Sequence, residues 1–111
     1  MSDKDETWEP TPDLIPQLMD EADEGNAISQ YNLGLCYAHG NGVEVDLPDA
    51  VRWFRKAAEQ GLPQAQFNLG LCLVRGVGVE KNVVEGTMWL NRAAQNGHAE
   101  AERMLKAWWG D

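Results

Sequence analysis

The sequence is poor in the residues that reactive sites and nucleic-acid surfaces need. Its 111 residues include two cysteines, two histidines, and nine lysines and arginines against eighteen aspartates and glutamates. Two cysteines do not make a disulfide framework. The formal net charge of −9 argues against binding to nucleic acid or to an anionic membrane surface. The chain also lacks any run of about 20 apolar residues that would span a bilayer.

The acidic charge is concentrated at the N-terminus. Residues 1–26 hold nine acids and one lysine, whereas the acids and bases of residues 27–111 nearly balance. Residues 1–13 have neither the basic segment nor the apolar segment of a secretory signal. We therefore expect a soluble, cytoplasmic protein with no membrane partner, and we expect residues 1–10 to form a flexible acidic tail.

What the sequence does contain is an internal repeat. Asn-Leu-Gly-Leu-Cys at residues 32–36 recurs at residues 68–72, an offset of 36. Without a gap, residues 27–62 match residues 63–98 at 14 of 36 positions. Hydrophobic residues make up 43 % of the chain, which is enough to bury a core. Two copies of one structural unit are therefore expected, stacked on each other.

Each copy reads as two helices separated by a glycine-containing loop. Gly40 suits the end of the first helix, and Asp46 and Asn82 suit the N-caps of the second helices, with Glu85 three residues after Asn82 as in a capping box. An apolar stripe before the first copy and another after the second predict one further helix at each end. We expect no strands and six helices, near residues 12–24, 27–39, 47–60, 63–75, 83–96 and 99–109.

These helices are expected to form one all-α solenoid domain over residues 11–111. It comprises a leading helix (11–26), two repeats (27–62 and 63–98) and a C-terminal capping helix (99–111). In the last helix Lys106 stands where the full copies have Gly34 and Gly70, and its long side chain would block the close approach of another helix. Trp109 aligns with an apolar position and should pack on the preceding helix, with Trp108 nearer solvent.

The repeat resembles the Sel-one-like (Sel1-like) repeat of the tetratricopeptide superfamily. The resembling residues of the first copy are Gln30, Asn32-Leu33-Gly34, Tyr37, Gly40, Gly42-Val43, Asp46, Ala50, Trp53 and Lys56-Ala57-Ala58-Glu59-Gln60-Gly61. The second copy departs at Leu73, where the family usually has tyrosine, and at Gly86, where it usually has alanine. The resemblance implies an α/α superhelical solenoid that serves as a protein-interaction scaffold, with no catalytic residues.

The residues able to carry chemistry are few and scattered. Cys36 and Cys72 lie inside predicted helices, where burial would raise the thiol pKa and make both inert. His39 and His98 have no second ligand at helical spacing that repeats in both copies. We therefore predict no enzymatic activity, no catalytic or metal site and no cofactor.

The outer face of the first helix in each copy is the candidate binding site. Tyr31 and Leu35 lie four residues apart on one face, and Phe67 and Leu71 repeat them one copy later. The four should line one apolar groove, rimmed by polar side chains that can bond to a backbone or a carboxylate: Asn32, Asn68, His39 and Arg75. The expected partner is a peptide or helix of another protein, or a second copy in a homodimer. The alternative is that these side chains simply pack adjacent helices together.

The acidic leading helix supports a second functional hypothesis. Asp20, Glu21, Asp23 and Glu24 gather at the end of that helix, where the helix dipole disfavours them. A solvated face is the ordinary explanation. Alternatively the helix meets a basic partner, as in an inhibitory or immunity-type protein.

Overall fold

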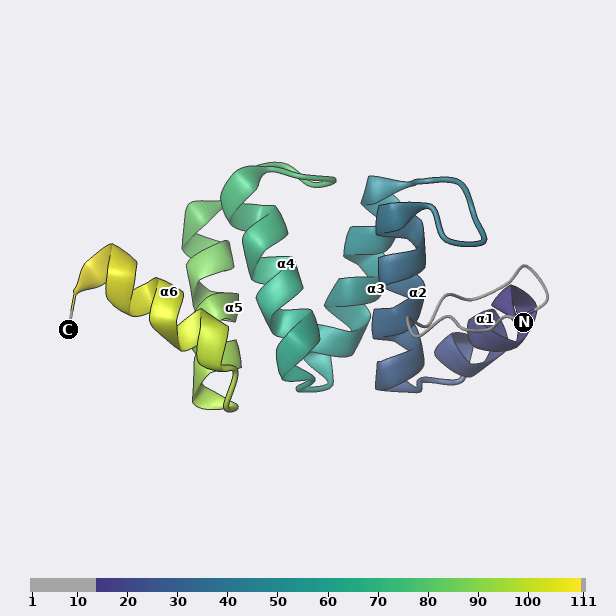
Figure 1. Cartoon of the computed structure of the whole chain (residues 1–111), viewed down its shortest axis with the longest axis horizontal. Helices are drawn as coiled ribbons and strands as arrows, with labels where there is room; N and C mark the ends of the chain where they lie inside the picture. The colour runs from purple at the N-terminus through teal and green to yellow at the C-terminus, as the bar shows by residue number, and fades with distance from the viewer. Residues whose placement is uncertain (1–13, 111) are drawn as a thin grey trace, which may run out of the picture.

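The computed structural model describes residues 14–110, and in that part of the chain it contains helices and no strands. The leading and last helices are single, and the other four form two helical hairpins (Figure 1). The order of elements is α1 (Ile15–Asp23), α2 (Ala27–His39), α3 (Leu47–Glu59), α4 (Pro63–Arg75), α5 (Val83–Gln95) and α6 (Ala99–Trp109). All six expected helices are confirmed, with ends that differ by up to three residues. The expected flexible tail, residues 1–10, and the expected helix start before residue 14 lie outside the described residues.

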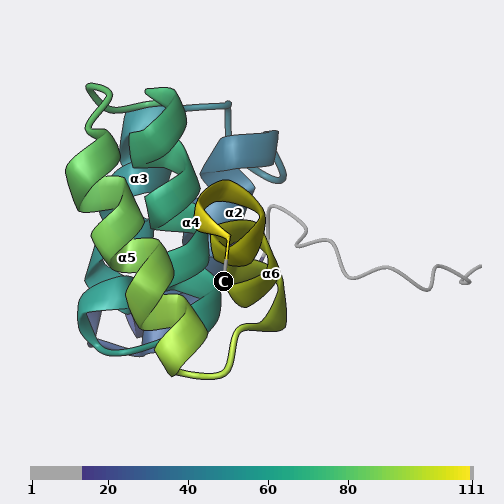
Figure 2. The same cartoon turned by 90° about the vertical axis from the view of Figure 1, so that its left-hand side faces the viewer.

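The helices stack in chain order as an α/α solenoid. Each helix packs on the next along the chain, and the described residues extend 49 × 29 × 22 Å. Figure 2 shows α3 and α5 on one side of the stack and α2 and α6 on the other. We call α2, α4 and α6 the first-type helices, and α1, α3 and α5 the second-type helices. A candidate surface on the first-type side is therefore built from successive repeats.

The helix ends follow from the capping residues that the sequence predicts. Asp46 and Asn82 accept hydrogen bonds from the backbone N–H groups of the third helical residues, at 3.1 and 3.0 Å. Gly40 and Gly76 end α2 and α4 with φ values of 75° and 73°, a left-handed conformation that glycine adopts without a steric penalty. These signals fix the hairpins locally, so the same loop forms in both repeats.

The two hairpins close tightly because a glycine lies where their helices cross. A Cβ atom added at Gly34 would stand 2.7 Å from ring carbons of Phe54, and one added at Gly70 would stand 2.8 Å from Cγ of Leu90. No real side chain fits at such distances. The glycines therefore permit the packing of α2 on α3 and of α4 on α5, which outweighs their cost in helix propensity of about 1 kcal/mol each.

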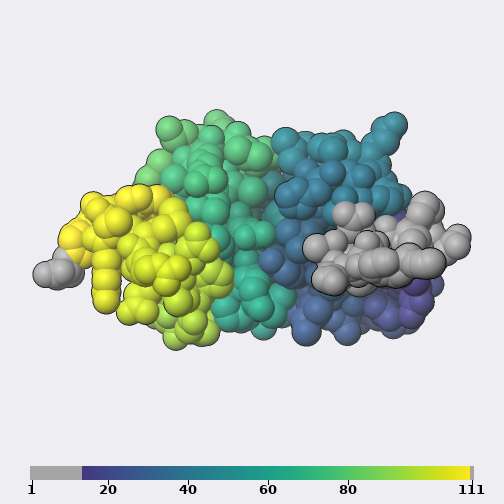
Figure 3. All heavy atoms as spheres, in the orientation of Figure 1, coloured from purple at the N-terminus to yellow at the C-terminus, as the bar shows by residue number. Residues whose placement is uncertain are grey.

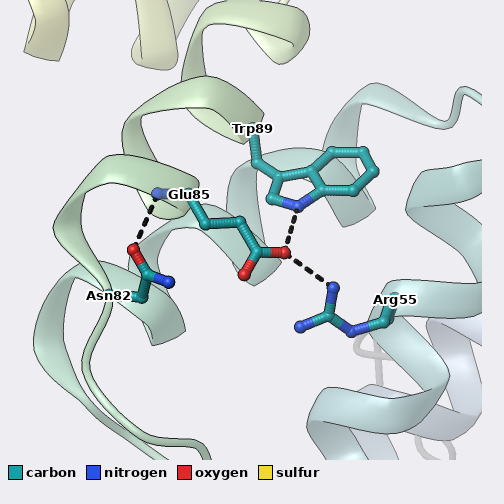
Figure 4. A network of polar contacts seen from close by, with 4 residues as sticks. All are labelled: Arg55, Asn82, Glu85 and Trp89. Atoms are coloured by element: carbon teal, nitrogen blue, oxygen red, sulfur yellow. Dashed lines mark hydrogen bonds and ion pairs between the residues drawn. The ribbon is translucent and has the colours of Figure 1, made fainter.

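Glu85 differs from its expected role as a capping-box partner. Its N–H donates to Asn82, but its carboxylate accepts from Nη1 of Arg55 at 2.8 Å and from Nε1 of Trp89 at 3.2 Å (Figure 4). The Arg55 guanidinium therefore holds the pKa of Glu85 below its usual value. The carboxylate ties α3 to α5 across the repeat boundary instead of capping its own helix.

The last helix is attached by one side only. Ala101 is its single buried residue. Trp109 lines a hollow with Thr87 and Asn91 of the preceding helix, as expected, but its side chain is 61 % exposed. It is more exposed than Trp108, at 43 %, which reverses the expected order. Trp108 is also exposed and meets Trp109 edge to face. α3 covers one face of α2, and α5 covers the equivalent face of α4. Within the described residues no helix follows α6, so the equivalent face of α6 is open.

Candidate functional site

A groove runs between α2 and α4 on the first-type side of the stack, and we call it the α2–α4 groove. Figure 3 shows this side, and the groove lies where the green-teal surface of α4 meets the blue surface of α2. It encloses about 180 Å³. One wall comes from α2 and the other from α4 and the residue after its C-cap: Leu35, Ala38 and His39 on α2, and Asn68, Leu71, Cys72, Arg75 and Val77 on the other side.

The floor of the α2–α4 groove is apolar. Phe54 reaches it from α3, which lies behind the two walls, and is itself buried in the main core. Leu35 and Leu71 are only partly buried, so their side chains remain available to a ligand. Ligand pockets for small molecules usually enclose about 300–1,000 Å³, and the groove is smaller than that. Its size suits one or two apolar side chains of a partner.

The polar rim lies mainly on α4. Arg75 is exposed at the end of that helix, and His39 is exposed at the end of α2. Burial raises the pKa of the Tyr31 phenol, and the neighbouring Asn68 side chain partly offsets that increase. The groove thus combines an apolar floor with a guanidinium, an imidazole and an amide at its edge.

Five of the eight residues predicted to bind a partner line the α2–α4 groove: Leu35, His39, Asn68, Leu71 and Arg75. Tyr31 is not among the residues that line the groove, and its ring lies 6.0 Å from that of Phe54. Asn32 is partly buried and does not line it.

Phe67 is the predicted residue that the structure places elsewhere. It is 8 % exposed and stacks on the ring of His98, with ring centroids 4.3 Å apart. His98 is also the N-cap of α6, where its Nδ1 accepts from the backbone N–H of Ala101. The N-cap of α6 therefore covers Phe67, whereas the equivalent residue at the N-cap of α4 is Leu62, which has no imidazole to stack on Tyr31.

Four further residues line the groove and were not among those predicted from the sequence: Ala38, Phe54, Cys72 and Val77. Phe54 and Val77 lie outside the first-type helices, so a search along the faces of those helices could not find them. Cys72 was expected to be buried and is only half-buried. Burial raises the pKa of the Cys72 thiol, and Arg75 partly offsets that increase. Cys72 and Arg75 are three residues apart on one helix, so they share a face. Because Arg75 was predicted to lie at the rim, this spacing could have placed Cys72 there too.

The leading helix does not fill the groove. Ile15, Leu18 and Ala22 of α1 pack against Leu33 and Cys36, which lie on a different face of α2 from Leu35. Burial raises the pKa of the Cys36 thiol. The carboxylate of Glu21 accepts a hydrogen bond from Oγ of Ser29 at 3.0 Å, so one member of the acidic cluster is tied to α2.

The described residues form neither a metal site nor a membrane span. No group of three or more histidine, cysteine, aspartate or glutamate side chains there is placed to hold a metal ion. Residues 14–110 also contain no helix with the length and apolar character needed to cross a membrane.

Comparisons with known proteins identify the repeat. The family model described as Sel1 repeat matches residues 27–62 and 63–98. No curated protein matches the chain. Among solved structures, the chain resembles a Sel1 repeat protein from Oxalobacter formigenes, with 38 % identity over 86 % of this chain and a TM-score of 0.84. It also resembles c5321, a protective antigen of uropathogenic Escherichia coli strains with an SLR fold, with 34 % identity over 86 % of this chain and a TM-score of 0.83.

A third structure shares the fold alone. Helicobacter pylori cysteine rich protein B is 24 % identical over 83 % of this chain and 69 % of its own, with a TM-score of 0.79. The chain spans only 28 % of the Oxalobacter protein and 21 % of c5321. The two matched repeats cover more than half of the chain, and their helices follow the order of the solved relatives. The chain therefore belongs to the Sel1 repeat family, whose members are generally protein-interaction scaffolds.

Proposed function

We propose that this protein is a non-catalytic interaction module that binds a peptide or a helix of another protein in the α2–α4 groove. The observation that carries the proposal is the open groove between equivalent helices of successive repeats, with Leu35 and Leu71 facing each other across an apolar floor. Partly exposed apolar side chains gathered in a concave site are typical of a docking surface.

The chemistry of the groove defines the ligand. One apolar side chain of the partner fills the space between Leu35 and Leu71, because the volume of about 180 Å³ holds little more. Arg75 and His39 then lie where they can bond to a carboxylate or a backbone carbonyl of the same partner. The ligand we propose is therefore an apolar residue with an acidic group or a chain end beside it.

The proposal is tested with two variants, one that fills the groove with a larger side chain and one that reverses the charge at its rim. Neither variant removes a core residue. Ala38→Phe places a ring in the groove, and Arg75→Glu replaces its exposed cation. Matched controls on α6, outside the groove, are Ala107→Phe and Arg103→Glu, since both residues are exposed. Captured host proteins are compared by affinity purification of all four variants and the wild type.

We expect both groove variants to lose the same captured protein, and both controls to keep it. Far-UV circular dichroism checks that each variant remains helical. If Ala38→Phe is folded and retains every captured protein, the groove is not the binding site. Sedimentation of the purified wild type detects the other proposed occupant, a second copy of the chain.

The acidic leading helix supports a second proposal, an inhibitory or immunity-type role against a basic partner. Asp20, Asp23 and Glu24 are exposed at the end of α1. Electrostatic association slows steeply as ionic strength rises, whereas docking in an apolar groove changes little. Association rates measured between 50 and 500 mM salt, as rough limits, therefore separate the two roles.

A further inference from the structure

Two buried glutamines form a ladder of side-chain amides along the solenoid. Gln30 donates to the carbonyl of Ala22 on the helix before it, at 3.0 Å, and accepts from Nε2 of Gln60 on the helix after it, at 2.9 Å. One repeat later, Gln66 donates to the carbonyl of Ala58 at 3.2 Å and accepts from Nδ2 of Asn96 at 3.0 Å. The helices α2 and α4 are thus each joined to the second-type helices on both sides.

The packing of a first-type helix against the second-type helix that follows it also depends on a glycine where the two helices cross. Gly34 and Gly70 leave no room for a Cβ atom once α3 and α5 are in place. A first-type helix therefore accepts a following second-type helix only if it has an amide at the ladder position and a glycine at the crossing position.

Both positions are changed in α6. It lies 36 residues after α4, so Glu102 stands at the ladder position of Gln66 and Lys106 at the crossing position of Gly70. The two side chains are exposed, with Nζ of Lys106 3.6 Å from a carboxylate oxygen of Glu102. Leu105 and Trp109 stand at the positions of Leu69 and Leu73, and both lie on the side of α6 that meets α5.

The opposite end of the stack is changed in the same way. The second-type helix α1 lies 36 residues before α3, so Glu24 stands at the position of Gln60 and Glu21 at that of Ala57, a fully buried residue. Leu14 takes the place of Ala50, whose carbonyl lies against Gly34. Leu14, Glu21 and Glu24 thus replace small or amide side chains of α3, and the carboxylate of Glu21 also accepts a hydrogen bond from Ser29 on α2.

We propose that these residues prevent copies of this chain from joining end to end. If α1 of a second copy packed on α6 in the register of the repeats, the solenoid would continue unbroken. Such a head-to-tail contact does not close, so it would generate filaments. Glu102 and Glu24 would then meet as two carboxylates where the repeats have an amide pair, and like charges at close range repel. Lys106 would stand where even a Cβ atom does not fit.

The proposal predicts that two variants will associate with each other when one carries repeat-like residues on α6 and the other carries repeat-like residues on α1. The first variant carries Glu102→Gln and Lys106→Gly. The second carries Leu14→Ala, Glu21→Ala and Glu24→Gln. Each is measured alone and in an equimolar mixture by sedimentation velocity at increasing concentration.

We expect the mixture to show twice the mass of either variant alone, and no more, because each chain then has one end with repeat-like residues. A chain with all five substitutions should grow further as its concentration rises. A matched control replaces Lys106→Gly by Lys106→Ala, which removes the charge but keeps the Cβ atom, and its mixture should not join. A mixture of folded variants that keeps the mass of its components, or an alanine control that joins as well as the glycine variant, would overturn the proposal.

The new glycine in the first variant could unfold α6, because glycine disfavours a helix. A second version of that variant therefore uses a sequence that already forms a helix in this chain. Residues 99–109 are replaced by residues 63–73, which contain Gln66 and Gly70 and form a first-type helix in this chain. Circular dichroism checks the helix content of both versions. The replaced helix should also join the second variant, and failure of this folded version to do so would contradict the proposal equally.

Discussion

The helices α4 and α6 occupy the same register of the repeat but differ in how much of them is buried. Six residues of α4 are buried, including Leu69 and Leu73, because α3 packs on one side and α5 on the other. On α6 only Ala101 is buried, and the equivalents of those two leucines, Leu105 and Trp109, are partly or largely exposed. A first-type helix is therefore largely buried only where a second-type helix follows it.

The difference shows that the repeat sequence specifies a helix but not its burial. Residues at one register position carry different energies depending on which neighbours are present, as expected when repeats are stabilised by nearest-neighbour interfaces. Paired substitutions at equivalent positions of α4 and α6 measure this directly.

The largest expected effect comes from truncating the equivalent leucines. Leu69→Ala should lower the free energy of unfolding by about 2–5 kcal/mol, because it leaves a cavity in a fully buried site. Leu105→Ala should cost about 1 kcal/mol or less, because that side chain is partly solvated. Urea unfolding followed by circular dichroism gives both values. Equal losses would mean that α6 is covered as fully as α4.

The crossing position should show the next largest contrast. Gly70→Ala places a Cβ atom 2.9 Å from the carbonyl oxygen of Gly86, which is backbone and cannot move aside cheaply. We expect a loss of about 1–3 kcal/mol even though alanine favours the helix. Lys106→Ala, at the same register, should change stability by less than about 0.5 kcal/mol. A stabilised Gly70→Ala protein in the same urea assay would show that the two helices can separate without cost.

A smaller effect is expected when the chain is shortened to end at Ala107. Register alone predicts a loss of several kcal/mol, because Trp109 aligns with the buried Leu73. Since Trp108 and Trp109 are exposed, we expect the free energy of unfolding to fall by about 1 kcal/mol or less. Differential scanning calorimetry of the shortened and full chains tests this, and a fall in melting temperature above about 10 °C would show that the tryptophans are docked.

The smallest effect concerns the joint between α3 and α5. Its ion pair, Arg55–Glu85, has no counterpart between α1 and α3, where Met19 stands at the arginine position. Because the pKa of Glu85 is lowered in the folded state, the pair stabilises the protein above the ordinary pKa of 4.5. This contribution is lost as the pH falls through the lowered pKa.

The variant Glu85→Gln measures that contribution. Both partners are about one-third exposed, so the loss at neutral pH should stay below about 1 kcal/mol and shrink below pH 4.5. Glu80→Gln, at an exposed neighbouring residue, serves as the matched control and should show no such trend. A loss that grows on acidification would contradict the assignment of the pair.

Most of the helical architecture was predictable because its determinants are local. The 36-residue period, the caps Asp46 and Asn82 and the terminal glycines Gly40 and Gly76 each act within a few residues of the chain. Even the role of Gly34 follows from a strong signal, since a glycine inside a helix needs a packing reason. Such features hold whatever else surrounds the repeat.

The candidate site was predicted less completely, because it depends on contacts between elements distant in sequence. Tyr31 and Phe67 are equivalent in the repeat, yet Asn68 lies beside the first and His98 stacks on the second. Likewise the carboxylate of Glu85 bonds to Arg55, thirty residues away, rather than to its own helix end. Periodicity treats equivalent positions as identical, whereas their neighbours are set by the stacking of the whole chain.

The burial of Phe54 has a consequence for binding. Its ring lines the α2–α4 groove, yet the side chain is only 3 % exposed and packs in the main core. Immobilising a side chain at an interface costs about 0.5–1.5 kcal/mol, so a side chain already held by core packing loses less entropy on association. The groove is in this sense preorganised: the apolar surface that a partner's side chain would meet is set by folding.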